Sequence, residues 1–410
     1  MDSADVVRWT LFGKVQAFVT LTTQDATEKI DWIVPQSSLE LESLFFRYGR
    51  CYDSYLGLEA GREYFWSQDR SGVVAYVRRG KYLNISGGLI APEEKKRQLL
   101  SEVLTFATEQ QFVPSFYNIP EDELPLFRQF GFQITKWGEE ALVDLNDQLW
   151  QGRAFEWVRR QVNYCHRQEL VCSEWDLDEL SVDERDAVVA ELREVSAAPL
   201  ALKPQAAEMT FLEGSFDPSQ MDRKRLFIAQ ADGGTGRIEG FLVANPCLNG
   251  AAWAFELYRY RPDAVRGTVA FLMHQTIQRL QFENVTHISL CLVPGLRCET
   301  PLPGDSGLVR HALVIAQKYF DFLFNTAGTH YFKSRFRPRY ENRYLCVWPK
   351  ATVGSFWAFV RVIGVLNLSP VKLWQSLRQQ IRSSKPLAIS GGTRSGQTLE
   401  TTSSEKTTCH

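Results

Sequence analysis

The sequence predicts a mixed α/β fold that contains two copies of one structural unit. In residues 82–117, a strand, a glycine-containing loop, a helix and a second strand follow one another. The same order of elements returns in residues 253–292, which indicates an internal duplication. The composition is consistent with two such units, because a chain of 410 residues with 44% apolar and 23% charged side chains can build more than one buried core.

The first half is predicted to alternate helices and strands. Proline and acidic residues at a helix start, and a glycine at a helix end, help to place the helices. The predicted helices are Leu39–Tyr48, Pro92–Gln110 and Glu121–Phe130. Runs rich in valine and aromatic residues predict the strands. These are Glu63–Trp66, Gly72–Arg78, Tyr82–Ser86, Phe112–Tyr117, Phe132–Lys136 and Ala141–Leu145.

The second half is predicted to repeat this order. Its elements are the strands Arg225–Gln230, Gly240–Ala244 and Ala252–Tyr260, a helix from Thr268 to Phe282, and the strand His287–Leu292. The glycines at 233–240 lack the following helix that a dinucleotide-binding loop needs, so they predict a hairpin turn.

Charge and cysteine content exclude several classes of protein. A net charge of −2 excludes a globally basic coat protein for nucleic acids, so any polyanion must meet a local patch. No uninterrupted apolar run reaches the roughly 18–20 residues that a membrane span needs. The 8 cysteines form no CxxC pair, which predicts free thiols in a reducing cytoplasm, with a zinc site or disulfides as the alternative.

Two segments concentrate basic residues. The predicted helix over 152–167 places Arg153, Arg160 and Arg167 seven residues apart on one stripe, which is either a solvated face or a polyanion site. The segment Tyr331–Tyr344 interleaves five cations with five aromatic residues. Arginine forks bind phosphates and aromatic rings stack on bases, so this segment is either a phosphate site or a charged surface loop.

The strand Trp253–Tyr260 carries the strongest candidates for catalysis. Alternation places Glu256 and Arg259 on opposite faces, so a bulge or strong twist is needed to bring them together. Beside a glycine loop and a helix start, such a pair suits a cleft in which an ester is bound and attacked. The alternative is a salt bridge without a catalytic role.

Both ends of the chain differ from the centre. Residues 350–385 hold six basic residues and no acid, and they include two apolar, aromatic-rich stretches. Residues 353–382 are therefore predicted to contact an anionic membrane surface, or else to pack on the core as terminal helices. Residues 1–38 are predicted to be an amphipathic helix and a linker, and residues 386–410 a disordered tail.

An ordered set of short stretches resembles the catalytic domain of bacterial lysylphosphatidylglycerol synthases. The stretches are Tyr48-Gly49 with Asp53-Ser54-Tyr55, Val74-Ala75-Tyr76, Phe116-Tyr117, Gly131-Phe132, Gly138–Leu145, Gly152-Arg153 with Arg159 and Asn163, Lys203 with Glu208, Phe211, Gly214 and Phe216, Leu257–Tyr260, and Lys333–Tyr344. Those enzymes move an amino acid from aminoacyl-tRNA to a membrane lipid headgroup. The resemblance implies a tandem GNAT-like fold of two mixed sheets flanked by helices, with tRNA and lipid meeting in a channel between the halves.

The resemblance also implies domains and site residues. The predicted parts after the N-terminal helix are a first GNAT-like domain at 39–150, a basic joining helix at 151–170, a second GNAT-like domain at 171–350 and membrane-contact helices at 351–385. Glu256 and Arg259 are the predicted catalytic residues. The predicted substrate-binding residues are Glu139, Lys203, Glu208, Phe211, Tyr258, Lys333, Arg337, Arg339, Tyr340 and Arg343. The predicted tRNA-binding residues are Arg153, Arg159, Arg160 and Arg167.

The sequence departs from the family pattern at three points. Glu256 stands where the family usually carries aspartate, Gly87-Gly88-Leu89 replaces a Gly-Asp-Pro loop, and the multi-span flippase segment of many full-length members is absent. The hypothesis is an aminoacyltransferase at the cytoplasmic face of the cell membrane, with aminoacyl-tRNA as co-substrate and no metal or cofactor. The alternatives are an N-acyltransferase that uses acyl-CoA, with Arg266-Gly267-Thr268 at its pyrophosphate, and a non-catalytic membrane-bound module.

Overall fold

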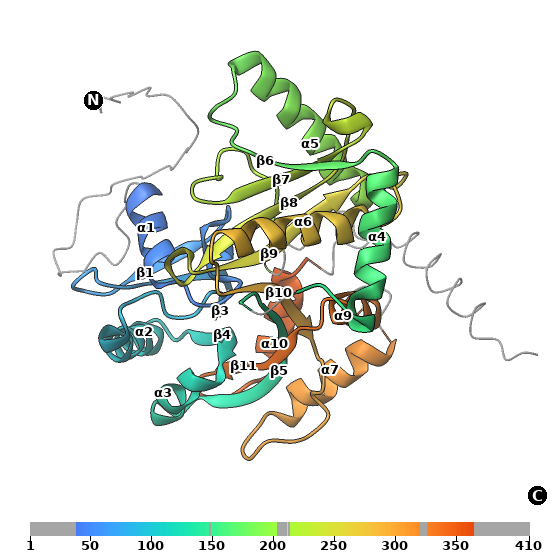
Figure 1. Ribbon diagram of the computed structural model, residues 1–410. Helices are drawn as coiled ribbons and strands as arrows, with labels where there is room; N and C mark the ends of the chain where they lie inside the picture. Colours follow the sequence, from blue (N-terminus) through green and yellow to red (C-terminus); the bar gives the residue numbers. More distant parts are fainter. Residues whose placement is uncertain (1–37, 147–148, 203–210, 212–213, 320–325, 365–410) are drawn as a thin grey trace, which may run out of the picture.

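The computed structural model describes residues 38–146, 149–202, 211, 214–319 and 326–364, and these form one 11-stranded mixed sheet flanked by helices (Figure 1). The strands are β1 (Glu63–Trp66), β2 (Val73–Arg79), β3 (Tyr82–Ile85), β4 (Val113–Pro120), β5 (Gln133–Asp144), β6 (Val171–Trp175), β7 (Arg225–Gln230), β8 (Ile238–Cys247), β9 (Ala252–Tyr260), β10 (His287–Pro294) and β11 (Arg339–Val347). Their order in the sheet is β1-β2-β3-β4-β11-β5-β10-β9-β8-β7-β6.

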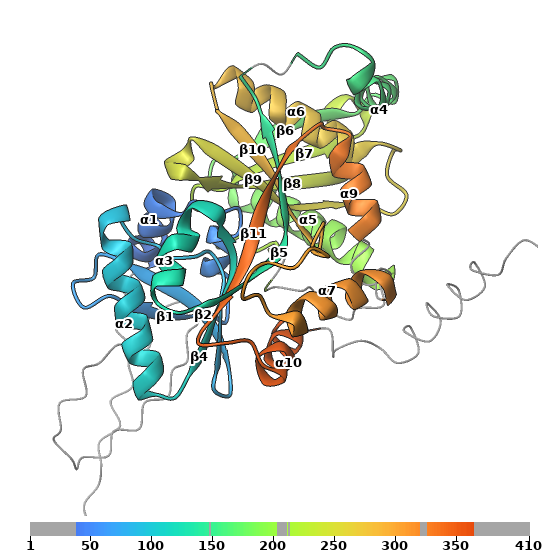
Figure 2. The ribbon, with the colours of Figure 1, turned by 90° about the horizontal axis from the view of Figure 1, so that it is seen from below.

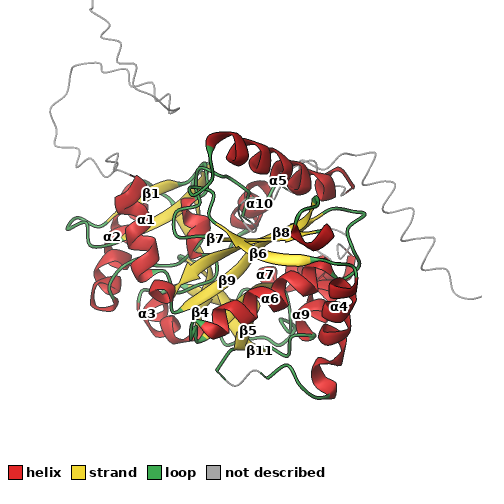
Figure 3. Cartoon of the chain, turned by 45° about the horizontal axis from the view of Figure 1, so that its top comes forward, coloured by secondary structure: helices red, strands yellow, loops and turns green. Residues whose placement is uncertain are grey.

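The helices cover both faces of this sheet (Figure 3). They are α1 (Ser38–Tyr48), α2 (Lys96–Glu109), α3 (Leu124–Gln129), α4 (Glu156–Arg167), α5 (Val182–Leu202), α6 (Thr268–Phe282), α7 (Gly307–Tyr319), α9 (Thr326–Ser334) and α10 (Val353–Val362). Alternate residues of β8 explain the two layers. Leu242 packs in the core beneath α6, while Phe241 and Val243 pack in a separate core beneath α5.

The predicted repeat is present as two parallel strand–helix–strand units. In the first half, β3 and β4 are parallel and α2 connects them, with Tyr82 opposite Val113. In the second half, β9 and β10 are parallel and α6 connects them, with Ala252 opposite His287. All other neighbouring strands in the sheet are antiparallel.

The prediction of two separate sheets is wrong, because the halves share one sheet. β11, the last strand in the described residues, lies between β4 and β5 of the first half, and β5 pairs on its other edge with β10 (Figure 2). Backbone hydrogen bonds therefore run without a break from β1 to β6. The predicted division into domains at 39–150 and 171–350 stays a prediction.

The prediction of two strands at 132–136 and 141–145 is also wrong, because β5 is one long strand. Gly138-Glu139-Glu140 reads as a polar break, yet these residues pair with β11 throughout. The register shifts at Trp137, which is the extra residue between the pairs formed by Lys136 and Gly138. Ion pairs satisfy both glutamates: Lys136 and Arg297 bind Glu139, and Arg343 binds Glu140.

The alternative of a surface loop at 331–344 is excluded, since this segment contains the end of α9 and most of β11. β6, α5 and α7 were not predicted. α10 packs inward, where Phe359 stacks on Tyr117 at 4.8 Å between ring centroids, but it leaves Trp357 52% exposed. The predicted elements at 1–37 and beyond residue 364 lie outside the described residues.

The described residues contain free cysteines, but neither a metal-ligating cluster nor a helix that could cross a membrane. Cys51, Cys165, Cys172, Cys247, Cys291, Cys298 and Cys346 are free thiols. In the described ranges, no three His, Cys, Asp or Glu residues gather as a metal ion would require, and no helix has the length and apolar character to cross a bilayer.

Candidate functional site

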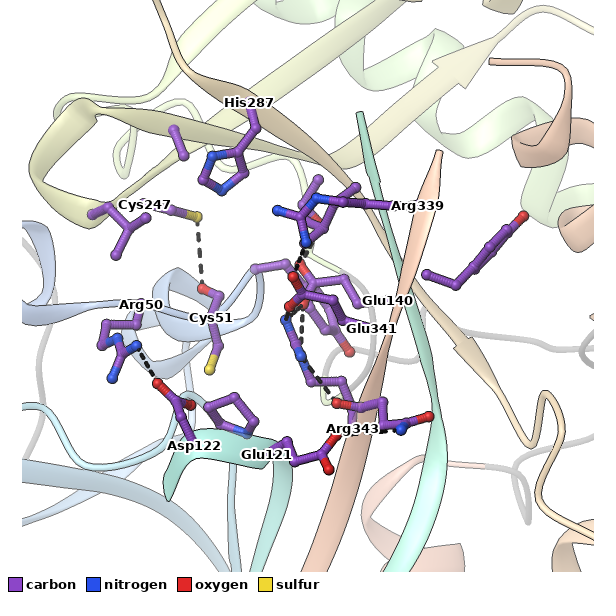
Figure 4. Close-up of a pocket in the computed structure, with 18 of the residues that line it drawn as sticks. Arg50, Cys51, Glu121, Asp122, Glu140, Cys247, His287, Arg339, Glu341 and Arg343 are labelled. Atoms are coloured by element: carbon purple, nitrogen blue, oxygen red, sulfur yellow. Dashed lines mark hydrogen bonds and ion pairs between the residues drawn. The ribbon is translucent and has the colours of Figure 1, made fainter. Parts of the chain in front are cut away.

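A cavity of about 530 Å³ lies where the two halves meet (Figure 4). The loop after α1 supplies Arg50 and Tyr52, and the end of β4 leads to Asp122. The second half supplies a third side, which includes Trp253 and His287. The remaining wall is the β5–β11 pair that joins the halves, so the fold itself places this cavity at the junction.

The floor of this cavity is a buried ion pair between β5 and β11. Arg343 Nε donates to Glu140 Oε2 at 2.6 Å, and the two side chains are 8% and 3% exposed. Burial lowers the pKa of Arg343, but the neighbouring Glu140 carboxylate more than offsets this and raises the pKa above its ordinary value. Ser289 of β10 also donates to Glu140, so three strands contribute to one polar cluster.

The rim of the cavity alternates positive and negative groups. Arg50 donates to Asp122 at 2.6 Å on one side, and Arg339 donates to Asp144 at 3.0 Å on the other. His287 points into the cavity between them (Figure 4). Burial and the nearby Arg339 lower the pKa of His287, which favours the neutral form of its imidazole.

Glu256 lies in a β-bulge, one of the two irregularities (a bulge or a strong twist) that the sequence left open. Val243 pairs with Leu257 and the next residue, Ala244, pairs with Phe255, so Glu256 is the extra residue on β9. Because of the bulge, the alternation of side chains between the two faces of β9 is shifted after Glu256. Phe255 and Tyr258 both pack against the core beneath α6, which leaves Glu256 and Arg259 off that face.

Two carboxylates converge near Gly214. The Gly214 N–H donates to Glu256 Oε1 at 2.5 Å. A Cβ at Gly214 would overlap Glu256 Oε2 and come within 3.6 Å of Glu59 Oε1, so a larger residue here would have to displace the Glu256 carboxylate. Ser215 donates to Glu59 at 2.6 Å, and Lys224 Nζ lies 3.7 Å from its other oxygen.

The Glu256 carboxylate also influences Tyr52, a residue of the central cavity. Tyr52 is 4% exposed and lines the cavity wall. Burial raises the pKa of its hydroxyl well above 10, and the negative charges of Asp53, Glu140 and Glu256 add to the shift. Tyr52 therefore lies within electrostatic range of carboxylates from both halves.

The remaining predicted substrate-binding residues lie in different parts of the structure. Arg339, Tyr340 and Arg343 line the central cavity, whereas Tyr258 lines a second cavity, of about 460 Å³. Lys333 is 4% exposed and donates to the backbone carbonyls of Cys291 and Leu292.

Two other predicted residues make contacts within the fold, and two more lie outside the described residues. Glu139 binds Lys136 and Arg297, and the buried Phe211 packs against Tyr117. Lys203 and Glu208 lie outside the described residues.

The four predicted tRNA-binding arginines also lie in different surroundings. Arg153 and Arg160 line a third cavity with Arg337. Arg159 instead donates to the carbonyls of Trp150 and Gly152, which fixes the loop before α4. Arg167 lies over the ring of Tyr164 at 5.9 Å.

Sequence reasoning missed Glu140, His287 and Glu59 as site residues. Glu140 lies within the Gly138–Leu145 stretch that carried the resemblance, so a signal was present for it. His287 and Glu59 follow no motif, and only the folded structure places them near the junction.

A sequence model of the family described as "Phosphatidylglycerol lysyltransferase, C-terminal" matches residues 45–347. The chain belongs to this family. Among individual relatives, phosphatidylglycerol lysyltransferase from Bacillus subtilis is 26% identical over 292 residues, which are 71% of this chain and 33% of the relative. The enzyme of the same name from Staphylococcus aureus strain MRSA252 is 22% identical, over 75% of this chain and 35% of the relative. The chain thus spans about a third of the length of these lysyltransferases.

Solved structures show the same fold. The structure of L-PGS from Bacillus licheniformis has a TM-score of 0.66 at 22% identity and covers 80% of this chain and 96% of the other. The C-terminal domain of a protein described as a lysylphosphatidylglycerol synthetase from Agrobacterium fabrum has a TM-score of 0.64 at 20% identity, with the same coverage. The predicted mixed α/β fold class is confirmed, with the correction that the two predicted sheets form one continuous sheet.

Proposed function

We propose that this chain transfers an aminoacyl group from aminoacyl-tRNA to a hydroxyl of a phosphatidylglycerol-like headgroup at the cytoplasmic face of the cell membrane. The observation that carries the proposal is the cavity at the junction of the two halves, in a chain of the lysyltransferase family. Both halves and the β5–β11 pair that links them form the wall of this cavity.

The reaction is a transesterification. The lipid hydroxyl attacks the carbonyl carbon of the aminoacyl ester, and a new ester bond forms. The bond from that carbon to the terminal ribose oxygen of the tRNA breaks, and the proton of the lipid hydroxyl passes to this ribose oxygen. Because the ester is already activated, the enzyme needs mainly positioning, a proton acceptor and stabilisation of the oxyanion.

Glu256 and Arg259 are assigned to the chemistry. The Gly214 N–H holds the Glu256 carboxylate in one orientation, in which it accepts the proton of the hydroxyl or binds the substrate ammonium. Arg259, like Glu256, does not lie on the face of β9 that packs beneath α6. It is assigned to binding the ester or the lipid phosphate. In the cavity, Arg339, the more exposed of the two arginines, is assigned to the lipid phosphate, while the Arg343–Glu140 ion pair forms the floor below it.

α10 is assigned to the membrane surface. Phe359 and Ile363 anchor one side of this helix in the core, while Val353, Trp357 and Arg361 remain exposed on the other. An exposed tryptophan beside an arginine suits the headgroup region of an anionic bilayer.

The test is a transfer assay with the full chain. Purified protein is incubated with a pool of radiolabelled aminoacyl-tRNAs and with vesicles that contain phosphatidylglycerol, and the lipid phase is extracted. Label in the lipid phase, lost when the vesicles contain only phosphatidylcholine, supports the proposal. Label that stays on tRNA or appears only as free amino acid overturns it.

A further inference from the structure

We propose that Glu59 of the first half is a positioning residue for Glu256 of the second half. Glu59 holds the chain at Ser215, and the N–H of the neighbouring Gly214 orients the Glu256 carboxylate. This inference rests on the proposed function, in which Glu256 takes part in the chemistry, and it adds a residue that acts through Glu256. Glu59 is 4% exposed and directly follows the short 3-10 helix Ser54–Leu58.

Residues 214–224, named here the crossing segment, lie between α5 and β7 and contact both halves of the fold. Phe216 packs on Phe241 in the core beneath α5, with 5.2 Å between the ring centroids, so this part of the segment belongs to the second half. The guanidinium carbon of Arg223 lies 4.4 Å from the ring centroid of Phe46 on α1, in the first half. The crossing segment is therefore held from both sides.

Glu59 is the buried centre of the contact between the crossing segment and the first half. Ser215 Oγ donates to Glu59 Oε2 at 2.6 Å, and Lys224 Nζ lies 3.7 Å from Glu59 Oε1. The side chains of Lys224 and Glu59 are 8% and 5% exposed. Because Ser215 and Lys224 stand near the two ends of the crossing segment, one carboxylate holds both ends in place.

The backbone beside Ser215 is the part of the crossing segment that reaches Glu256. The Gly214 N–H donates to Glu256 Oε1 at 2.5 Å, and hydrogen bonds to a charged acceptor are among the stronger ones. A Cβ at Gly214 would overlap Glu256 Oε2 and lie 3.6 Å from Glu59 Oε1, so the two carboxylates face the same small space. Glu59 therefore acts on Glu256 both through the backbone that it holds and through its own negative charge.

Other titratable or charged groups near these two carboxylates come from several elements. They include Arg62, Lys224, Tyr52, Arg259, Cys291 and Lys333. Burial raises the pKa of the Tyr52 hydroxyl and of the Cys291 thiol, so neither group ionises near neutral pH. A change at Glu59 or at Ser215 is therefore expected to be visible in the titration of the Glu256 carboxylate itself.

The two contributions of Glu59 affect this titration in opposite directions. The Gly214 N–H stabilises the charged carboxylate, so a looser backbone in Ser215→Ala should raise the titration midpoint of Glu256. The negative charge of Glu59 disfavours a second carboxylate nearby. Glu59→Gln, which keeps an oxygen that accepts from Ser215, should therefore lower the midpoint. A residue that only stabilised the fold would not separate the two variants in this way.

The test follows the Glu256 carboxylate by NMR in the full chain. Glutamate labelled with ¹³C at the side-chain carboxyl is incorporated, and the signal that is missing in Glu256→Gln is the signal of Glu256. The parent, Ser215→Ala and Glu59→Gln are titrated, and thermal unfolding confirms that each is folded. Glu40→Gln, which changes an exposed glutamate on α1, is the matched control.

The expected result is a midpoint about half a pH unit or more higher in Ser215→Ala and about half a pH unit or more lower in Glu59→Gln. Glu40→Gln should titrate like the parent. Label transfer to lipid by Ser215→Ala should fall roughly tenfold, because a displaced catalytic group costs rate. Unchanged midpoints in both variants, or shifts in the same direction, overturn the inference.

The inference and the proposed function fail separately. Opposite shifts of the midpoint without label transfer by the parent contradict the proposed function and leave the positioning role of Glu59 standing. Transfer by the parent, together with midpoints that do not respond to Ser215→Ala and Glu59→Gln, contradicts the positioning role alone.

Discussion

Arg343 and Glu140 are separated by 203 positions in the sequence, yet Arg343 Nε lies 2.6 Å from Glu140 Oε2 in a buried ion pair. Glu140 lies on β5, the last strand of the first half, and Arg343 on β11, which follows all the strands of the second half. The pair therefore joins the two repeats at the point where the central cavity lies.

Removal of one member of this pair is expected to destabilise the fold. Glu140→Ala leaves a buried guanidinium without its main partner, and losses of about 3–5 kcal/mol in the free energy of unfolding are typical for such changes. Urea unfolding followed by tryptophan fluorescence measures the effect. The double variant Glu140→Gln/Arg343→Met is expected to lose less than Glu140→Ala, and an equal or larger loss would show that the pair is not the dominant interaction there.

Asp53 is expected to make stability depend on pH. Burial raises the pKa of this carboxyl to about 6, although the Asn118 side chain and the Gly87 N–H donate to it. The folded chain then holds this proton to a higher pH than the unfolded chain does. The stability that Asp53 contributes is fully present below about pH 4 and is lost as the pH rises through 6, by about 3 kcal/mol.

Asp53→Asn removes this titration while it keeps an oxygen that accepts hydrogen bonds. The difference in unfolding free energy between variant and parent should therefore shift in favour of the variant by about 2–3 kcal/mol from pH 4 to pH 7. Urea titrations at both pH values give this difference. A pH-independent difference would mean that Asp53 ionises in the folded chain at its ordinary pKa.

Neutralising Glu256 is expected to abolish most of the transfer. Glu256→Gln retains the size of the side chain but not the proton acceptor, and general-base contributions of roughly 10²–10⁴-fold set the expected loss in rate. Glu256→Asp keeps a carboxylate that is one methylene shorter, so it should retain part of the activity. The control is Glu109→Gln, an exposed glutamate on α2. Parent-like transfer by Glu256→Gln would remove Glu256 from the chemistry.

The exposed side of α10 is expected to bind anionic vesicles. Trp357→Ser should reduce the fraction of protein that sediments with phosphatidylglycerol vesicles several-fold, because interfacial tryptophans anchor proteins at the headgroup level. Phe282→Ser removes an apolar side chain that is 81% exposed at the end of α6 and serves as the control. A similar reduction in both variants would indicate general apolar adhesion and not a defined membrane face.

Local patterns predicted the repeated unit well. The helix Thr268–Phe282 and the strand Ala252–Tyr260 have the predicted bounds, since helix starts, glycines and β-branched runs are local signals. The sequence also indicated that a bulge or a strong twist would be needed to bring Glu256 and Arg259 together, and β9 has a bulge at Glu256.

Long-range pairing was not predictable in the same way. Nothing local distinguishes β11 from a charged loop, because its polar residues are satisfied by partners about 200 positions away. The same holds for β5, whose central glutamates read as a break until Arg297 and Arg343 are placed beside them. The cavity at the junction depends on both strands, so its residues could be recognised only in part from the sequence.

The most direct test of the central claim is lipid mass spectrometry. Lipids are extracted from bacterial cells that make phosphatidylglycerol but no aminoacylated lipid, and that express this chain, its Glu256→Gln variant or neither. We expect a new lipid only with the parent chain, heavier than phosphatidylglycerol by one amino acid residue, whose mass identifies that amino acid. Identical lipid profiles in all three cultures, with the protein present and folded, would contradict it.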